Sequence, residues 1–151
     1  MKKDFVIRGQ LASGETEIIE FGGYKEGYAY KMTEFSIFPS TNIGGTNYEL
    51  AASVTAAKTL EDPSNPNFNN EGLIATALNV GSEIGSGRPQ QGPLSIVNDT
   101  FLITQNLILA VIDTNVGLPM GVNYQMRFES VKLTDSQQAV SNYKQFSIFD
   151  E

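Results

Sequence analysis

Residues 100–133, TFLITQNLILAVIDTNVGLPMGVNYQMRFESVKL, decide the fold class of this 151-residue chain. They contain two long runs rich in β-branched and aromatic residues, joined by a loop with the strand breakers Gly117, Pro119 and Gly121. We therefore predict a long antiparallel pair of strands at the centre of an all-β domain. A period of two places odd positions of the first run and even positions of the second in the core. This predicted core set is Phe101, Ile103, Leu107, Leu109, Val111, Val122, Tyr124, Met126 and Phe128.

Upstream of residue 100, the chain reads as a series of shorter strands separated by polar loops. The predicted strands are Phe5 to Leu11, Thr16 to Phe21, Tyr28 to Ile37, Tyr48 to Ala56, Leu73 to Val80 and Leu94 to Val97. The first two flank a turn at Gly14 and are expected to form an opening hairpin. The fourth alternates cleanly and should be half-buried, whereas the fifth is apolar on both faces and should be buried on both.

In the third of these strands, the apolar residues change from even to odd positions partway along. Tyr28, Tyr30 and Met32 occupy even positions, whereas Phe35 and Ile37 occupy odd ones. A slip of one residue turns every later side chain to the opposite face of a sheet. A bulge or bend near Thr33 is therefore the less costly interpretation.

After residue 133 the apolar period changes from two to about 3.6 residues. Thr134 and Gln137 form a capping-box pattern. The residues that follow on one stripe are Ala139, Val140, Tyr143 and Phe146. We predict one short C-terminal helix near Asp135 to Gln145.

About eight strands, three long loops and no helix before the end predict a two-sheet antiparallel sandwich of jelly-roll type. A second sheet is needed to cover the apolar face of the first. We expect a single jelly-roll-like domain over residues 1–151. A closed eight-stranded barrel is the structural alternative, although its strands are normally joined by short hairpins.

Composition excludes several classes of function. The chain has no cysteine, histidine or tryptophan, which excludes disulfides, thiolate or imidazole metal ligands, and Ser-His-Asp or cysteine nucleophile chemistry. Its 17 acidic and 10 basic residues give a net charge of −7, so we expect no direct nucleic-acid binding and no membrane binding. We find no apolar run with the length of a membrane span or the pattern of a signal peptide, and we expect folding in a cytoplasm without export.

The loop from Asp62 to Glu71 carries oxygen-bearing side chains at near-regular intervals, as calcium-binding loops do. These side chains belong to Asp62, Asn65, Asn67, Asn69 and Glu71. Pro63 and Pro66 stiffen the loop, and the bend-making glycine of an EF-hand is missing. We therefore favour a plain surface loop over a calcium site.

The segment GSEIGSGRPQQG, residues 81–92, has glycines at spacings reminiscent of a phosphate cradle. It lacks the Lys-Ser/Thr ending of a P-loop, and no helical pattern follows it. We favour a surface loop that orders against a neighbouring subunit. Arg88 is its only cation and is available to pair with an acidic edge.

Two other residue sets have both a chemical and a structural interpretation. Facing carboxylates for glycoside hydrolysis could come from Glu15, Glu17, Glu20, Glu34 and Glu49, and a sugar-stacking platform could come from Tyr24, Tyr28, Tyr30 and Tyr48. We favour solvent-facing glutamates and tyrosines that pack in the core or an interface. The acceptor pattern Asn98-Asp99-Thr100 has no role without export. We therefore assign no catalytic, cofactor-binding or metal-binding residue and expect no cofactor.

The C-terminal part of the chain resembles a known family. A strand ending IDTNVG, a Gly/Pro loop, the strand VNYQMRFESVKL and a helix beginning LTDSQQAV are together similar to the end of single jelly-roll virion proteins of small tailless phages and environmental viruses. The resemblance covers about Ile103 to Val140. It implies self-assembly rather than chemistry, and the missing basic N-terminal arm argues against direct genome binding.

Three functions from different classes remain. We favour a virion structural protein, a self-assembling capsid subunit rather than a decoration protein, and not an enzyme. Its partners would be copies of itself and other virion proteins, so the protein would be a homo-oligomer, located in the virion and assembled in the host cytoplasm. The alternatives are a carbohydrate- or calcium-binding β-sandwich module and a hydrolase with two carboxylates.

Overall fold

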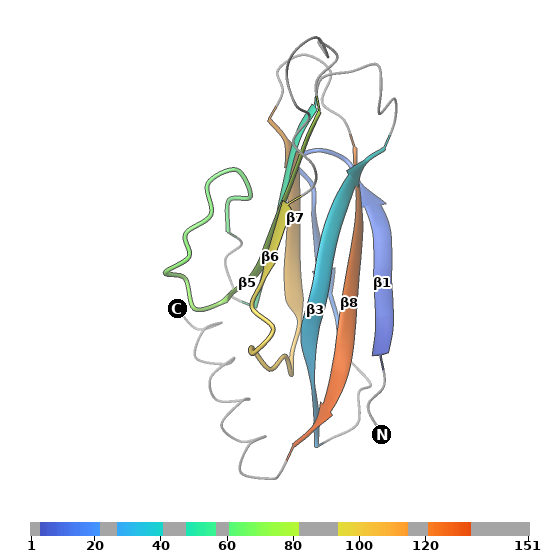
Figure 1. Cartoon of the computed structure of the whole chain (residues 1–151), viewed down its shortest axis with the longest axis vertical. Helices are drawn as coiled ribbons and strands as arrows, with labels where there is room; N and C mark the ends of the chain where they lie inside the picture. Colours follow the sequence, from blue (N-terminus) through green and yellow to red (C-terminus); the bar gives the residue numbers. More distant parts are fainter. Residues whose placement is uncertain are drawn as a thin grey trace.

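The computed structural model of this chain describes residues 4–21, 27–40, 48–56, 61–81, 94–114 and 121–133. Regular structure within these ranges consists of eight strands that form two layers (Figure 1). The strands are β1 (Asp4–Leu11), β2 (Thr16–Ile19), β3 (Tyr28–Pro39), β4 (Tyr48–Thr55), β5 (Leu73–Gly81), β6 (Leu94–Val97), β7 (Leu107–Asp113) and β8 (Val122–Lys132). The predicted helix near Asp135 to Gln145 lies outside the described residues.

The strand order is that of a jelly roll except at β6, which pairs with β5 instead of β3. One sheet has the order β1-β8-β3 and the other has the order β2-β7-β4-β5-β6, with every pairing antiparallel. The first strand pairs with the last, the second with the seventh, and the fourth with the fifth. This nesting results when one long hairpin of strands is rolled over on itself. The prediction of a two-sheet sandwich of jelly-roll type is confirmed.

The predicted pairing of consecutive strands is wrong in two places. β1 and β2 do not form an opening hairpin, because β1 pairs with β8 and β2 pairs with β7. The two runs of residues 100–133 are not paired either, since β7 lies between β2 and β4 whereas β8 lies between β1 and β3. In both places the two consecutive strands belong to opposite layers of the sandwich, whose inner faces cover each other.

The first of those two runs is also a shorter strand than predicted. Regular pairing of β7 begins at Leu107. Before it, Ile103 makes an isolated bridge to Tyr30 of β3, with N···O distances of 2.7 and 2.9 Å. The run therefore touches the three-stranded sheet first and then crosses to the five-stranded sheet.

The core lies between the inner faces of the two sheets and contains every residue of the predicted core set. On β7 and β8, Leu107, Leu109, Met126 and Phe128 are completely buried. One end of the core is aromatic, with ring centroids 5.2–6.5 Å apart among Phe5, Phe21, Tyr30 and Phe128. The period of two thus predicts the buried faces of β7 and β8 correctly.

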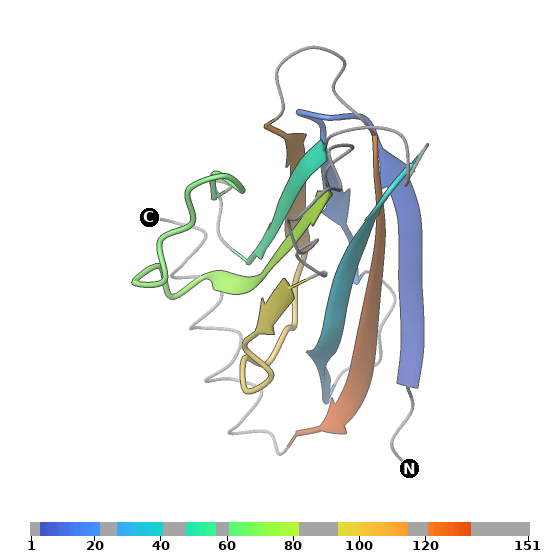
Figure 2. The ribbon, with the colours of Figure 1, turned by 45° about the horizontal axis from the view of Figure 1, so that its top comes forward.

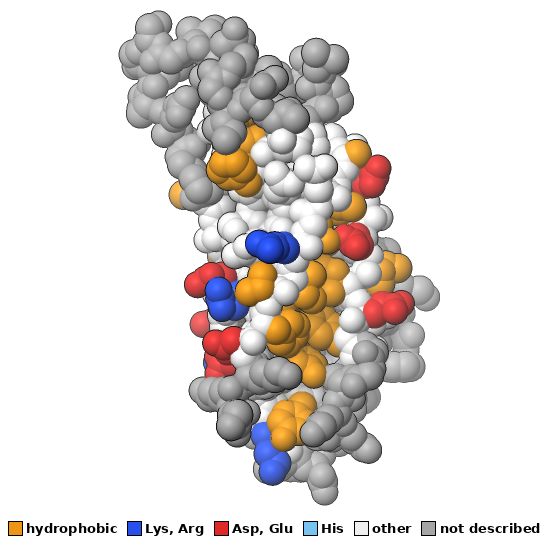
Figure 3. Space-filling view, turned by 90° about the vertical axis from the view of Figure 1, so that its right-hand side faces the viewer, with side chains coloured by type: hydrophobic (Ala, Val, Ile, Leu, Met, Phe, Trp, Pro, Cys, Tyr) orange, Lys and Arg blue, Asp and Glu red, His pale blue; other side chains and the backbone are white. Residues whose placement is uncertain are grey.

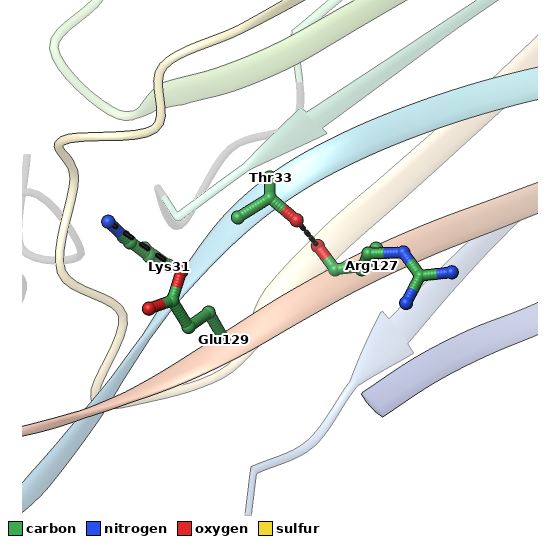
Figure 4. Close-up of polar contacts among 4 residues, drawn as sticks. All are labelled: Lys31, Thr33, Arg127 and Glu129. Carbon is green, nitrogen blue, oxygen red and sulfur yellow. Dashed lines mark hydrogen bonds and ion pairs between the residues drawn. The ribbon is translucent and has the colours of Figure 1, made fainter. Parts of the chain in front are cut away.

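β3 contains the predicted bulge. Its register against β8 shifts between Met32 and Glu34. Thr33 lies at the shift, and its Oγ1 donates a hydrogen bond to the main-chain oxygen of Arg127 at 3.3 Å (Figure 4). The extra residue allows Met32 and Phe35 both to be buried in the core although their positions differ in parity.

The burial of β4 and β5 differs from the prediction. β4 is buried on both faces, because its outward-facing Ala51, Ser53 and Thr55 are covered as well. Ser53 Oγ donates a hydrogen bond to the main-chain oxygen of Glu61 at 2.8 Å, so the chain at Glu61 lies over this strand. β5, in contrast, leaves Leu78 exposed on its outer face.

Replacing Phe128 with Ala should lower the free energy of unfolding by about 3–5 kcal/mol, because the side chain is completely buried. Phe38 on the neighbouring strand is 49% exposed, so Phe38→Ala is the matched control and should cost less than about 1 kcal/mol. Urea unfolding followed by circular dichroism measures both changes. Equal losses for the two variants would contradict the assigned core.

Candidate interaction surface

Four large apolar side chains lie exposed at the β5–β6 end of the five-stranded sheet, and we call them the β5–β6 patch. They are Phe68, Leu78, Leu94 and Ile96, with exposed fractions of 63, 36, 51 and 60%. Single exposed apolar side chains are common on protein surfaces. A group of large ones is typical of a face that binds or assembles.

Strand geometry gathers this patch. The register of β5 and β6 places Leu78 opposite Leu94, and Thr76 opposite Ile96. Residues two apart share a face of a strand, so Leu94 and Ile96 both lie on the outer face. Val97 has the other parity and packs against the core. Phe68 belongs to the loop of residues 61–72, which projects beside β5 and away from the three-stranded sheet (Figure 2).

Two open hollows meet at Ile96. The larger, of about 600 Å³, lies between the loop prolines Pro63 and Pro66 and the outer face of β5 and β6, and its lining includes Leu78 and Leu94. The smaller, of about 370 Å³, is lined by Phe68 and by neighbouring residues of β5 and β6. The surface is therefore hollowed as well as apolar, and a protruding apolar side chain of a partner could fill it.

The loop that borders the patch uses its side-chain oxygens to hold its own main chain. Asx turns run from Asp62 to Ser64, from Asn67 to Asn69 and from Asn70 to Gly72, each with a donor–acceptor distance of 3.0 Å. Asp62 and Asn67, two of the oxygen-bearing residues that suggested calcium, are acceptors in these turns, in line with the favoured plain surface loop. Among the described residues, no group of three acidic side chains could hold a metal ion.

Glu61 fastens the centre of the same loop. Its Oε1 accepts a hydrogen bond from the main-chain nitrogen of Asn67 at 2.9 Å, and its Oε2 accepts one from Asn70 Nδ2 at 2.7 Å. A single carboxylate therefore links two turns. This arrangement positions Phe68, which lies between the two bound residues, beside the patch.

Tyr124 and Glu17 connect the two sheets on the side where β1 and β2 are edge strands. Tyr124 Oη donates a hydrogen bond to the carboxylate of Glu17. The ring reaches β2 because it lies over Gly9, its partner on β1, where a Cβ atom would be 2.7 Å from Tyr124 Oη. Burial, followed by the hydrogen bond to Glu17 and the charge of that residue, raises the pKa of Tyr124 to about 12.

A second polar contact connects the sheets away from that edge. Asn79 is buried on the inner face of β5, and its Nδ2 donates a hydrogen bond to the main-chain oxygen of Ile37 on β3 at 2.8 Å. Buried amides are tolerated only when they are hydrogen-bonded. Together with the contact between Tyr124 and Glu17, this bond fixes how one layer lies over the other.

The candidate carboxylates have separate partners. Glu17 binds Tyr124, whereas the Glu34 carboxylate lies 3.5 Å from Arg127 Nε on the outer face of the three-stranded sheet. Glu49, on the other sheet, accepts a hydrogen bond from Thr114 Oγ1 at 2.9 Å. These three glutamates therefore do not face one another as a catalytic pair. Glu15 and Glu20 are exposed at the two ends of β2.

Two of the candidate tyrosines and the glycosylation pattern have structural roles. Tyr30 packs in the aromatic end of the core, and Tyr48 is buried, whereas Tyr24 and residues 82–92 lie outside the described residues. Asn98 Oδ1 accepts hydrogen bonds from the main-chain nitrogen and Oγ1 of Thr100, at 3.2 and 2.8 Å. The Asn98 side chain thus forms the turn after β6.

The β5–β6 patch is a site that the sequence reasoning missed. Leu94 and Ile96 alternate with a polar residue as core residues do, and alternation alone does not say which face of a strand points inward. The available signal was the composition of LSIV, which has apolar residues of both parities in a strand of only four residues. Such a strand exposes apolar side chains unless both of its faces are covered.

Compared by sequence, the chain matches no protein-family model and no curated protein. In the described ranges, no helix has the length and apolar character needed to cross a membrane.

The stability of the protein should fall as the pH rises from about 10 to about 12. In this range the unfolded chain loses the Tyr124 proton, at an ordinary pKa of about 10, while the folded chain keeps it. The folded state then binds more protons than the unfolded state, so the free energy of unfolding decreases with pH, whereas below pH 10 this contribution is constant.

The measurement is urea unfolding at a series of pH values for the natural chain and for Tyr124→Phe. The variant should lose the hydrogen bond to Glu17 and show a shallower alkaline decline. Parallel curves above pH 10 would mean that Tyr124 does not carry the effect.

Replacing Glu61 with Ala should loosen the loop of residues 61–72, because two hydrogen bonds lose their acceptor. We expect a loss of about 1 kcal/mol in the free energy of unfolding and faster hydrogen exchange at the amide of Asn67. The matched control is Glu71→Ala in the same loop, where the side chain is exposed and the change should stay within about 0.5 kcal/mol. Unchanged exchange at Asn67 would contradict the assigned role of Glu61.

Proposed function

We propose that this protein is a virion structural protein that assembles with copies of itself as a capsid subunit. The observation that carries the proposal is the β5–β6 patch, which leaves four large apolar side chains in water on the outside of a complete sandwich. Burial of such side chains against a neighbouring copy is favourable by about 25 cal/mol per Å² of apolar area. The patch therefore supports the proposal that the stable form of this protein is an assembly.

The fold supports the same proposal. A jelly-roll sandwich is an architecture used by viral capsid domains, and it supplies a scaffold whose outer faces, edges and loops are available for repeated contacts. The resemblance of Ile103 to Val140 to the end of jelly-roll virion proteins agrees with this reading. The net charge of −7 fits an outer-surface position, or a shell whose genome is neutralised by other components.

The test is assembly of the purified chain and of Ile96→Asp, followed by light scattering and negative-stain microscopy. The natural chain should form trimers, pentamers or closed shells. Ile96→Asp should form no particle larger than a dimer, because a carboxylate on the patch would have to lose its hydration on assembly. At a concentration where the natural chain is also unassembled, the two melting temperatures should be equal, since Ile96 is 60% exposed.

The matched control is Ile18→Asp. Ile18 is an equally exposed isoleucine, at 62%, on β2 at the opposite edge of the same sheet. This variant should assemble as the natural chain does. A natural chain that stays monomeric at high concentration, or equal effects of the two variants, would overturn the proposal.

A further inference from the structure

We propose that the free edge of β1 is a second contact surface, on which β1 of another copy of this chain adds as an antiparallel strand about a two-fold axis at Val6. This inference rests on the proposed function, because it names a partner surface for self-assembly. It uses the three-stranded sheet, whereas the β5–β6 patch lies on the five-stranded sheet. The two surfaces can therefore be tested separately.

β1 has the form of a strand that accepts another strand. It pairs with β8 on one side and with no other strand that the structure describes, and it forms the outer margin of its layer (Figures 1 and 2). It is eight residues long, contains no proline, and keeps an unbroken register with β8. An edge strand of this kind has a row of unpaired backbone groups and is a template for strand addition.

The inner face of β1 is incompletely covered. Phe5 and Ile7 point toward the core but are only half-buried, whereas Met126 and Phe128, which lie opposite them on β8, are completely buried. Figure 3 faces this side of the molecule and shows a stripe of apolar side chains between charged ones. A strand added to β1 would extend the layer and cover Phe5 and Ile7.

The charges on β1 select one register for a two-fold pair. Only alternate residues of an edge strand direct their backbone groups outward, so aligned residues must have the same parity and the axis must pass through a residue. With the axis at Val6, Asp4 of each copy lies opposite Arg8 of the other, and Phe5 lies opposite Ile7. With the axis at Arg8, the two arginines would face each other, which is unfavourable.

Asp4 lies in surroundings that favour an added cation. Its partner across β1 and β8 is Glu129, and like charges directly opposite are destabilising. Glu129 is paired on its other side with Lys31 of β3, with 3.8 Å between Nζ and Oε2 (Figure 4). Within the described ranges, neither Asp4 nor Arg8 forms an ion pair.

The second copy completes this row of charges. Arg8 of that copy would lie on the open side of Asp4. The row across the extended sheet would then read Lys31, Glu129, Asp4 and Arg8 of the second copy, with a cation at each end and the two carboxylates between them. An exposed pair of this kind adds little affinity but discriminates between registers. Two such pairs form, because the axis repeats the contact.

The first experiment is a charge swap, made in the Ile96→Asp chain so that assembly through the β5–β6 patch is absent. Sedimentation equilibrium should give a dimer whose dissociation constant rises about tenfold in Asp4→Arg and in Arg8→Asp. The double variant restores opposite charges in both contacts and should return to within about threefold of the starting value. Glu71→Arg, which makes the same charge change on the other side of the sandwich, is the matched control and should have no effect.

The second experiment locates the axis. The chain has no cysteine, so a single introduced cysteine forms an intermolecular disulfide only where it meets itself. Under mild oxidation Val6→Cys should give a covalent dimer on a non-reducing gel. Gln10→Cys, also exposed and on the same face of β1, is the matched control and should remain monomeric.

The outcomes separate this inference from the proposed function. A double variant that remains as weak as the single variants, or cross-linking at residue 10 as efficient as at residue 6, overturns the two-fold contact at Val6. If the natural chain assembles while the Ile96→Asp chain is strictly monomeric, the β1 contact is wrong and the proposed function stands. If both chains are strictly monomeric, both proposals fail.

Discussion

Mutual burial of the two inner faces is the constraint on which the rest of this structure depends. Neither sheet can keep its apolar face in water. The position of each strand therefore depends on its packing against the opposite layer as well as on its pairing with the strand beside it. This requirement explains why β1 and β2, and also β7 and β8, lie in different sheets although each pair is consecutive in the chain. It also explains why β3 needs a bulge, since one inward face has to be kept over twelve residues.

Two hydrogen bonds give this apolar contact a definite geometry. Apolar burial is not directional, but the bonds from Tyr124 to Glu17 and from Asn79 to Ile37 each join one sheet to the other at a fixed place. The layers are thereby held in one relative position. The β5–β6 patch and the edge of β1 belong to different layers, so the same bonds set the angle between the two surfaces on which assembly is proposed.

The sequence predicted the faces of the strands better than their neighbours. A period of two identifies inward residues such as Leu109 and Met126, and a change of parity locates the bulge at Thr33, because both are local properties of the chain. Pairing between β1 and β8 depends on how the two layers pack, and no sequence pattern within either strand identifies its partner. The β5–β6 patch escaped prediction for a related reason, since Leu94 and Ile96 alternate in the same way as core residues.

The pairing of β1 with β8 also determines when this layer can form. Gln10 and Asn123, whose side chains are hydrogen-bonded at 2.9 Å, are 113 positions apart in the chain. A ribosome adds about 5–20 residues per second, so β1 waits roughly 6–23 s for its partner during synthesis. Because β8 is the central strand of the three-stranded sheet, neither β1 nor β3 has its neighbour in that sheet before then. Folding of this layer therefore begins only after β8 has been made.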